Sequence, residues 1–337
     1  MLLLVMHKIE IIDFYENGVK LNEINYVFTP TITVPYKSKV VTNVDKEQVE
    51  IKFPRISPKI PYEVSEGFET TWIRTKEKNP EVTNGIIANL QKLDYQNGEL
   101  VWQENLTDFK TLSGIRSGIL ADLEEELQDR LLTQLAPTAP GAVVETSDDQ
   151  FILGVRGGRV HLEGKIMPFP VGHPKYNFHK NPSQNYLENP IQSLSRQAIT
   201  EMSLPLYSPD MNKVYGVAKE LSLIGVVRDR GTTENKSGSW NPLPTFYIKT
   251  KWDAEQCRNG YETAIDKYEH ERFLTIDIDE TTLSKTIEEF YSRFVGNGLG
   301  ELLLYGRFRF KDKWYENTIK KLEKKFKTQI KEGNPFQ

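Results

Sequence analysis

The sequence is poor in the residues that build disulfide-stabilised or cysteine-rich folds. Cys257 is the single cysteine among 337 residues, so neither a disulfide within the chain nor a Cys-rich metal site can form. We interpret Cys257 as a side chain without a chemical role. Internal repeats and low-complexity tracts are also missing. With 38% hydrophobic and 27% charged residues, the composition is that of a folded chain rather than a disordered one.

Long apolar runs are missing as well. No stretch approaches the ~18 consecutive apolar residues that span a membrane. The apolar start at residues 1–6 is shorter than the core of ~7–15 residues in a secretion signal, and His7, Lys8 and Glu10 end it. We interpret it as the beginning of a strand that continues to Phe14. The expected location is the cytoplasm, and no membrane contact is expected.

A strong charge of one sign is the third absence. The net charge of −4 gives no general attraction to nucleic acid or to an anionic membrane. The segment 311–337 differs, because it carries eight lysines and four acidic residues. Its apolar residues Ile319, Leu322, Phe326 and Ile330 recur at three- and four-residue steps, which predicts a basic amphipathic C-terminal helix. We expect this helix to dock on its own domain; nucleic-acid binding is an alternative that no aromatic or arginine-rich pattern supports.

The chain is long for one domain of roughly 100–200 residues. The proline-marked stretch 135–141 predicts a linker, which divides the chain into an N-terminal lobe over 1–136, rich in β-strands with some helix, and a second domain over 140–310. In the lobe we expect a hairpin turning at Asn17-Gly18, a helix over 63–79, a hairpin over 86–101 and a helix over 115–135.

In the second domain the expected elements alternate between strands and helices. They are a hairpin over 142–156, a helix over 190–202, strands over 221–227, 245–249 and 271–278, a helix over 281–294 and a strand over 300–310. This order predicts an α+β sandwich with helices packed on a mixed sheet.

The expected helix 190–202 carries a spaced set of polar residues. Seven residues separate Glu188 from Arg196. Gln197 and Glu201 lie one helical turn apart, so both side chains project from the same face. A turn at Gly172 stands before the helix. The spacing therefore places two acids, an amide and an arginine on, or just before, one helix that follows a glycine turn.

These residues resemble the Nudix hydrolase box, G-x5-E-x7-R-E-U-x-E-E-x-G-U, where U is apolar. Gly172 corresponds to the opening glycine, Glu188 to the first glutamate, Arg196 to the arginine and Glu201 to the last glutamate. The resemblance implies a Nudix α/β/α sandwich with a mixed sheet, preceded by the β-rich lobe.

The box is degenerate, because this sequence departs from the family pattern in four ways. Gln197 replaces the glutamate after the arginine, Thr200 replaces the first of the paired glutamates, and Ser203 replaces the glycine. The segment 173–187 also places 15 residues between Gly172 and the first glutamate, where the family has five.

Further features resemble the Nudix branch that hydrolyses UDP-sugars such as UDP-glucose. In chain order they are Trp72, Asp108-Phe109, the hairpin 142–156, Gly172-His173-Pro174, Leu204-Pro205, Leu223-Ile224-Gly225-Val226 and Phe246-Tyr247. Each is weak alone, and their shared order over roughly residues 65–310 is the signal.

The resemblance implies metal-assisted chemistry. Cleaving a diphosphate requires positive charge on the phosphate oxygens while water attacks phosphorus, and Mg²⁺ or Mn²⁺ supplies it. The implied metal ligands are Glu201, Gln197 and Glu188, and the two glutamates are the implied catalytic residues. An amide at Gln197 and a hydroxyl at Thr200 contribute no charge, so attraction for a divalent ion is weakened. Arg196 is implied to be structural and to orient the glutamates.

Alternatives stay open at every position. Glu188 also suits a helix N-terminus, and Glu201 suits a solvated helix face. The candidates for substrate binding are Gly172, His173, Arg156, Arg228 and Trp240. His173 also fits a loop hydrogen-bonding role, the arginines fit an ordinary surface, and Trp240 lies in a long polar loop that is either functional or mobile.

Two functions follow as hypotheses. The first is a hydrolase of the Nudix type, a diphosphatase that cleaves a nucleoside diphosphate-sugar or a related nucleotide, with Mg²⁺ or Mn²⁺ as cofactor if it is active. The second, prompted by Gln197 and Thr200, is a catalytically impaired Nudix-fold protein with a binding or regulatory role. The expected partner is a nucleotide or nucleotide-sugar, and a homodimer stays open.

Overall fold

The computed structural model describes most of the chain. The described residues are 8–16, 19–28, 32–33, 62–96, 99–117, 137–158, 163–177, 186–188, 190–206, 216–229, 243–326 and 329–332, with a few single residues between 119 and 160. In 8–33 and 329–332 the backbone alone is described.

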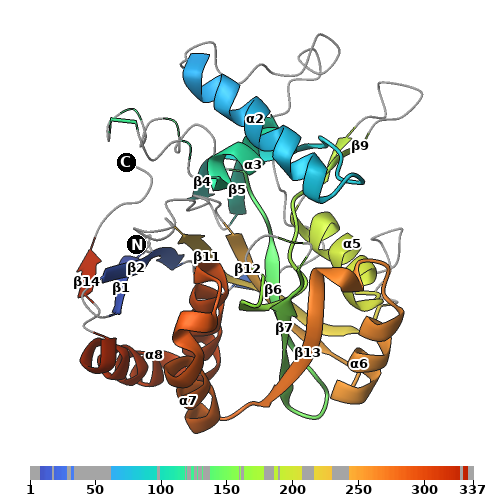
Figure 1. The fold of residues 1–337 in the computed structure, drawn as a ribbon. Helices are drawn as coiled ribbons and strands as arrows, with labels where there is room; N and C mark the ends of the chain where they lie inside the picture. The colour runs from blue at the N-terminus through green and yellow to red at the C-terminus, as the bar shows by residue number, and fades with distance from the viewer. Residues whose placement is uncertain are drawn as a thin grey trace.

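A mixed β-sheet forms the centre of the molecule (Figure 1). Its strands follow the order β13-β7-β6-β12-β11-β2-β1-β14. Their bounds are β1 (Lys8–Glu16), β2 (Val19–Phe28), β6 (Gly141–Glu145), β7 (Gln150–Arg156), β11 (Ala218–Asp229), β12 (Leu243–Thr250), β13 (His270–Asp277) and β14 (Gln329–Glu332). The short strands β3 (Ile32–Thr33) and β8 (Ile166–Pro168) pair with β11 and β7. The β6–β12 pair is parallel and its neighbours are antiparallel, so the mixed sheet is confirmed.

Helices cover both faces of this sheet. Their bounds are α5 (Pro190–Met202), α6 (Ala254–Thr263), α7 (Glu280–Phe290) and α8 (Gly296–Phe326). Successive residues of a strand point to opposite faces, so Val143 packs in one core with α7 and α8, while Ala142 and Val144 pack in the other with α5 and α6. Figure 1 shows the two helix pairs on either side of the strands. The architecture is therefore an α+β sandwich, as expected; its Nudix form stays a prediction.

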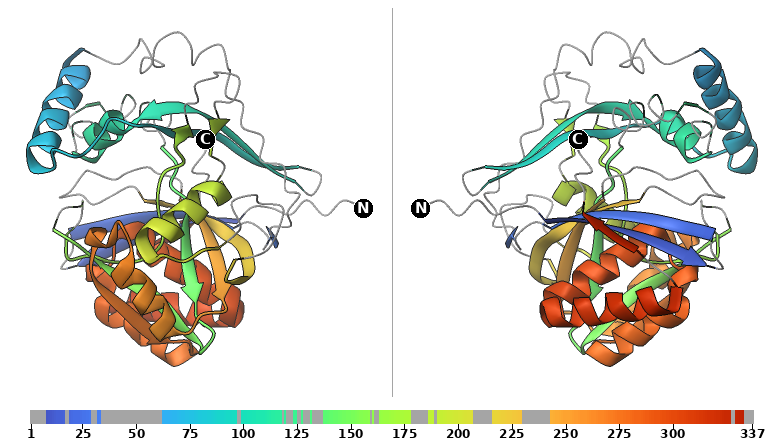
Figure 2. Two further views of the ribbon diagram at one scale, coloured as in Figure 1. Left: turned by 90° about the vertical axis from the view of Figure 1, so that its right-hand side faces the viewer. Right: turned by 90° about the vertical axis from the view of Figure 1, so that its left-hand side faces the viewer.

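A second hairpin with two helices lies beside the sheet. It comprises α2 (Tyr62–Lys78), β4 (Ile86–Gln96), β5 (Glu99–Asp108) and α3 (Phe109–Arg116), and Figure 2 shows it above the central strands. Two backbone hydrogen bonds hold it in place. Ala88 N donates to Pro174 O at 3.2 Å, beside the Gly172 turn, and Thr138 N, in the segment before β6, donates to Ala88 O at 3.1 Å. The small sheet of β9 (Tyr176–Asn177) and β10 (Tyr186–Leu187) stands nearby. This unit is thus tied to the turn before α5.

Several expected elements are confirmed within a few residues. They are the hairpins β1–β2, β4–β5 and β6–β7, the helices α2, α5 and α7, and the strands β11, β12 and β13. Most of the expected helix 115–135 lies outside the described residues. Strands β1 and β2 join the large sheet through β11, so the first strands of the expected N-terminal lobe extend the sheet of the following domain. The boundary near residue 136 stays a prediction.

The strand expected over 300–310 is wrong, because this segment belongs to α8. A short apolar run such as Leu302-Leu303-Leu304 does not distinguish a strand from a buried helix, and all three leucines are buried in the core with α7. Lys311 interrupts α8 with a φ of 73°. The expected C-terminal helix is confirmed as far as Phe326, but β14 follows it and pairs with β1.

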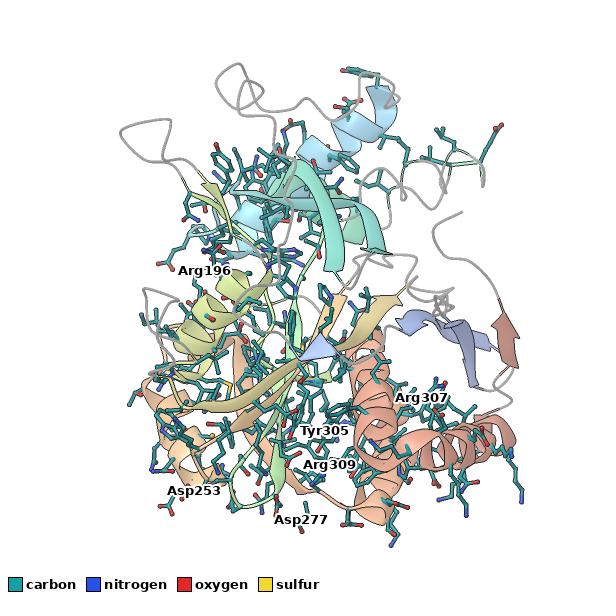
Figure 3. All side chains as sticks on the ribbon, turned by 180° about the vertical axis from the view of Figure 1, so that it is seen from behind. Arg196, Asp253, Asp277, Tyr305, Arg307 and Arg309 are labelled. Carbon is teal, nitrogen blue, oxygen red and sulfur yellow. The ribbon has the colours of Figure 1, made fainter. Side chains whose placement is uncertain are left out.

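A cluster around a buried glutamate fixes α8 to the sheet. Tyr305 Oη donates to Glu145 Oε2 at 2.9 Å, and Lys249 Nζ donates to Glu145 Oε1 at 2.6 Å. Arg309 Nε lies 3.6 Å from the same carboxylate. Figure 3 shows Tyr305 and Arg309 close together where α8 meets the strands. Two cations and a hydroxyl therefore satisfy a carboxylate that would be costly to bury alone. Among the described residues, no helix combines the length and apolarity needed to cross a membrane.

Candidate functional site

Helix α5 carries the central residues of the candidate site. Pro190 begins it, which suits the first helical position because proline fixes φ and its missing N–H would be unpaired there. Leu194, Ala198 and Met202 are fully buried and hold one face of the helix in the core. Ser203 follows the helix with a φ of 49°, a left-handed conformation that glycine commonly provides at a helix end.

A salt bridge joins the turn before α5 to the helix. Arg196 donates to Glu188 from Nε at 2.9 Å and from Nη2 at 2.8 Å, and Nη2 also donates to His173 O at 2.8 Å. Glu188 Oε2 further accepts from Lys175 N at 3.0 Å. Arg196 lies where α5 approaches the unit formed by α2, β4, β5 and α3 (Figure 3). Both Glu188 oxygens are engaged, so this geometry favours the structural role for Glu188 and Arg196.

Gly172 lies directly against Gln197. A Cβ at Gly172 would stand 1.4 Å from Gln197 Nε2, so a larger residue fits only if the Gln197 side chain moves. Ser193 Oγ donates to Gly172 O at 3.1 Å, and Thr200 Oγ1 donates to Gln197 Oε1 at 3.1 Å. Gly172 N in turn donates to Pro140 O at 3.1 Å. The turn is therefore fixed between the start of β6 and α5, and the side chains of Gln197 and Thr200 bond to each other.

Glu201 points inward from α5 and is only 1% exposed. Its Oε1 accepts from Val171 N at 3.4 Å, and its Oε2 lies 3.4 Å from His270 Nε2. Burial raises the pKa of Glu201 to about 8, and the guanidinium of Arg156 opposes this rise. The solvated role that Glu201 could have had is therefore wrong, because its carboxyl is enclosed next to the Gly172 turn.

Three further residues surround this carboxyl. Arg156 Nη1, at the end of β7, lies 4.0 Å from Glu269 Oε2, and burial raises the pKa of Glu269 to about 7. Burial, assisted by Arg156, lowers the pKa of His270 to about 3, and the ring stacks on Phe169 at 4.3 Å. His270 is therefore neutral, and its contact with Glu201 is a hydrogen bond rather than an ion pair.

The unit formed by α2, β4, β5 and α3 contacts the site through aromatic side chains. Trp72 packs edge-on against Phe109 with ring centroids 6.4 Å apart, and Phe109 packs against His173 at the same distance. His173 Nδ1 lies 2.7 Å from Thr138 O. Trp72, Phe109 and His173, which are far apart in the sequence, thus form a continuous series of ring contacts that ends beside Gly172.

Two expected site residues cannot be placed. Arg228 belongs to β11 by its backbone, opposite Asn25 of β2, but its side chain lies outside the described residues, as does Trp240. Arg156, in contrast, does not lie on an open surface, because its side chain is 14% exposed and turned toward Glu269.

The sequence did not single out Glu269, His270 or Glu301. The first two reach the site because β13 pairs with β7, which sets His270 opposite Arg156. Glu301 on α8 is fully buried, and neither carboxylate oxygen has a hydrogen-bond partner among the described residues. It fits beside Gly141, where a Cβ would stand 2.6 Å from its Oε1. No local pattern marks these residues, because the β7–β13 pairing brings Glu269 and His270 to the site and the approach of α8 to β6 places Glu301 beside Gly141.

The donor set does not fit a magnesium site built by the protein. Magnesium prefers carboxylate oxygens in an octahedral arrangement, whereas α5 offers one enclosed carboxyl at Glu201 and an amide at Gln197. Throughout the described part of the chain, no group of three or more His, Cys, Asp or Glu side chains is arranged to hold a metal ion.

Comparison with known proteins gives one distant similarity. No protein-family model matches the chain. Over 259 residues, the chain is 24% identical to Nudix hydrolase 9 of Arabidopsis thaliana, in an alignment that covers 69% of this chain and 79% of that protein. This is a distant similarity to one member of the Nudix superfamily.

Proposed function

We propose that this protein is a Nudix-type hydrolase that cleaves the diphosphate of a nucleoside diphosphate-sugar or a related nucleotide. The observation that carries the proposal is the pair of hydrogen bonds from Arg196 to Glu188 and to His173 O. These bonds fix the Gly172 turn against α5, next to Glu201. The distant similarity to a Nudix hydrolase supports the same reaction class.

The turn and the helix have distinct roles in the proposal. A glycine turn lets the backbone approach a phosphate closely, because no side chain intervenes. Glu201 exchanges a proton near neutral pH, since burial raises its pKa to about 8, and such a pKa suits a general acid–base group. We assign it proton transfer for the attacking water. The rings of Trp72, Phe109 and His173 offer an apolar wall for a base or sugar.

The second candidate function is binding without turnover. It is favoured by Gln197 and Thr200, whose side chains bond to each other at 3.1 Å where the family places charged glutamates. A protein of this kind would hold a nucleotide at the turn and release it unchanged. Replacing both residues with glutamate then converts a binding protein into a metal-dependent hydrolase.

A hydrolysis panel separates the two functions. The wild type is incubated with nucleotide-sugars and dinucleotides, with and without Mg²⁺ or Mn²⁺, and products are resolved by chromatography beside an active Nudix enzyme. Release of nucleotide and sugar phosphate supports the hydrolase. Binding by calorimetry without any product, together with turnover in the Gln197→Glu, Thr200→Glu variant, supports the binding protein instead.

A further inference from the structure

We propose that His270 is a positioning residue whose ring holds the Glu201 carboxyl in one orientation beside the Gly172 turn. The inference rests on the proposed function, because it assigns the side chain that orients the proton-transferring group of that site. His270 acts through Glu201, and no contact between its ring and the substrate is assigned. The structural part of its test does not depend on turnover.

Two contacts on different oxygens define the orientation of the Glu201 carboxyl. Its Oε1 accepts a hydrogen bond from Val171 N at 3.4 Å, and its Oε2 lies 3.4 Å from His270 Nε2. The side chains of Glu201 and His270 are 1% and 0% exposed, so water does not compete for their contact. A carboxyl group turns readily about its last side-chain bond, and a contact at each oxygen therefore fixes it where a single contact would not.

The ring of His270 is itself fixed on its other sides. It stacks on Phe169 with the ring centroids 4.3 Å apart and the planes inclined by 28°. Gly154 of β7 lies against the ring, since a Cβ there would stand 2.3 Å from His270 Nδ1. Tyr261 Oη donates to His270 O and holds the backbone. Phe169 precedes Val171 by two residues, so the ring and the N–H that hold Glu201 are tied to the same short segment.

The contact between His270 and Glu201 needs no charge on either group. A neutral imidazole carries a hydrogen on Nε2 in one tautomer and lacks it in the other. Nε2 therefore bonds to Oε2 both when the carboxyl is ionised and when it is protonated. A group that exchanges protons needs a partner of this kind, because its orientation then persists through the exchange.

The ring also fills the core, so packing and positioning have to be separated. Phenylalanine at position 270 keeps a ring for Phe169 and loses the nitrogen that faces Glu201. Glutamine loses the ring, but its side-chain amide carries a polar atom at about the reach of Nε2. Positioning therefore predicts that glutamine retains what phenylalanine loses, whereas a packing role predicts the reverse.

The test compares crystal structures of wild type, His270→Phe, His270→Gln and, as a matched control, Tyr261→Phe, which removes a hydroxyl that bonds to the backbone of His270. Circular dichroism establishes that each variant is folded. We expect the Glu201 carboxyl to keep its orientation in the control and in His270→Gln, and to turn away from residue 270 in His270→Phe. With UDP-glucose as substrate, we expect kcat to fall at least about tenfold in His270→Phe while KM stays within about twofold of wild type. The His270→Gln variant should recover most of that loss.

Two results would overturn the proposal. One is a wild-type crystal structure in which Glu201 and the His270 ring are too far apart for a hydrogen bond. The other is a folded His270→Phe protein in which Glu201 keeps the wild-type orientation. Should His270→Phe fail to fold, the ¹⁵N resonances of the His270 ring in wild type and Glu201→Gln decide, because unchanged resonances contradict the contact and shifted ones support it. A wild type without hydrolase activity would contradict the proposed function and leave the structural comparison decisive for His270.

Discussion

Arg196 and Glu188 form a two-bond salt bridge, with Nε and Nη2 of the arginine 2.9 and 2.8 Å from the two carboxylate oxygens. The side chains are 23% and 7% exposed, so water screens the pair only partly. The same guanidinium holds His173 O. The pair therefore connects the turn, its long following segment and α5, and the rest of the candidate site depends on it.

Removing one partner should leave the other charge poorly solvated. We expect Glu188→Ala to lower the free energy of unfolding by about 3 kcal/mol, the lower end of the range for a buried pair because Arg196 is partly exposed. Urea denaturation measures the loss. Glu262 pairs with Lys267 at 3.8 Å on an exposed surface, so Glu262→Ala should change stability by less than about 0.5 kcal/mol. Equal losses in both variants would contradict the assigned role.

Gly172 should tolerate a side chain only if Gln197 gives way. We expect Gly172→Ala to destabilise the protein by about 1–3 kcal/mol, because its Cβ would overlap Gln197 Nε2. The double variant Gly172→Ala, Gln197→Ala should recover most of that loss. A double-mutant cycle on thermal unfolding measures the coupling. Strictly additive effects would show that the two residues do not touch as described.

Lys311 is strained at the break in α8. Its φ of 73° and ψ of 178° belong to a region that suits glycine and costs other residues about 1–3 kcal/mol. Lys311→Gly should therefore raise the melting temperature. Lys313→Gly, in the exposed helix two residues later, should lower stability by about 1 kcal/mol. Two variants that shift the melting temperature in the same direction would contradict the strain.

Burial of Glu301 makes stability depend on pH. Its folded-state pKa is raised well above the ordinary 4.5 because the carboxyl is fully buried, so the folded protein keeps a proton that the unfolded chain releases. The stabilising contribution is complete below pH 4.5 and is lost as the pH rises through the folded-state pKa. Glu301→Gln removes this titration, so wild type should lose stability relative to the variant as the pH rises. Parallel stability curves for the two proteins would refute the buried placement of Glu301.

Local signals in the sequence predicted part of the fold well. Pro190 and the Leu204-Pro205 end mark α5, and its observed bounds agree with the expected helix. Helix α6 went unpredicted although Asp253 and Gln256 form a capping box, a local signal that could have identified it. The helical conformation of residues 300–310 could not be predicted from the local sequence, because an apolar run of this length fits either a strand or a buried helix.

The candidate site was predictable to the extent that it lies along α5. The spacing from Glu188 to Glu201 was visible in the sequence, and these residues do gather around the Gly172 turn. Arg156 was visible as a strand-end residue, but its inward orientation depends on the β7–β13 register. Glu269 and His270 depend on the same register, and no periodicity within their own segment indicates a site.

The measurement that tests the central claim most directly is the rate of nucleotide release from a UDP-sugar by wild type and Glu201→Gln, with Glu262→Gln as control. The account predicts product formation by the wild type and the control, and a rate at least about 100-fold lower in Glu201→Gln. A folded Glu201→Gln protein that hydrolyses the substrate as fast as the wild type would contradict it.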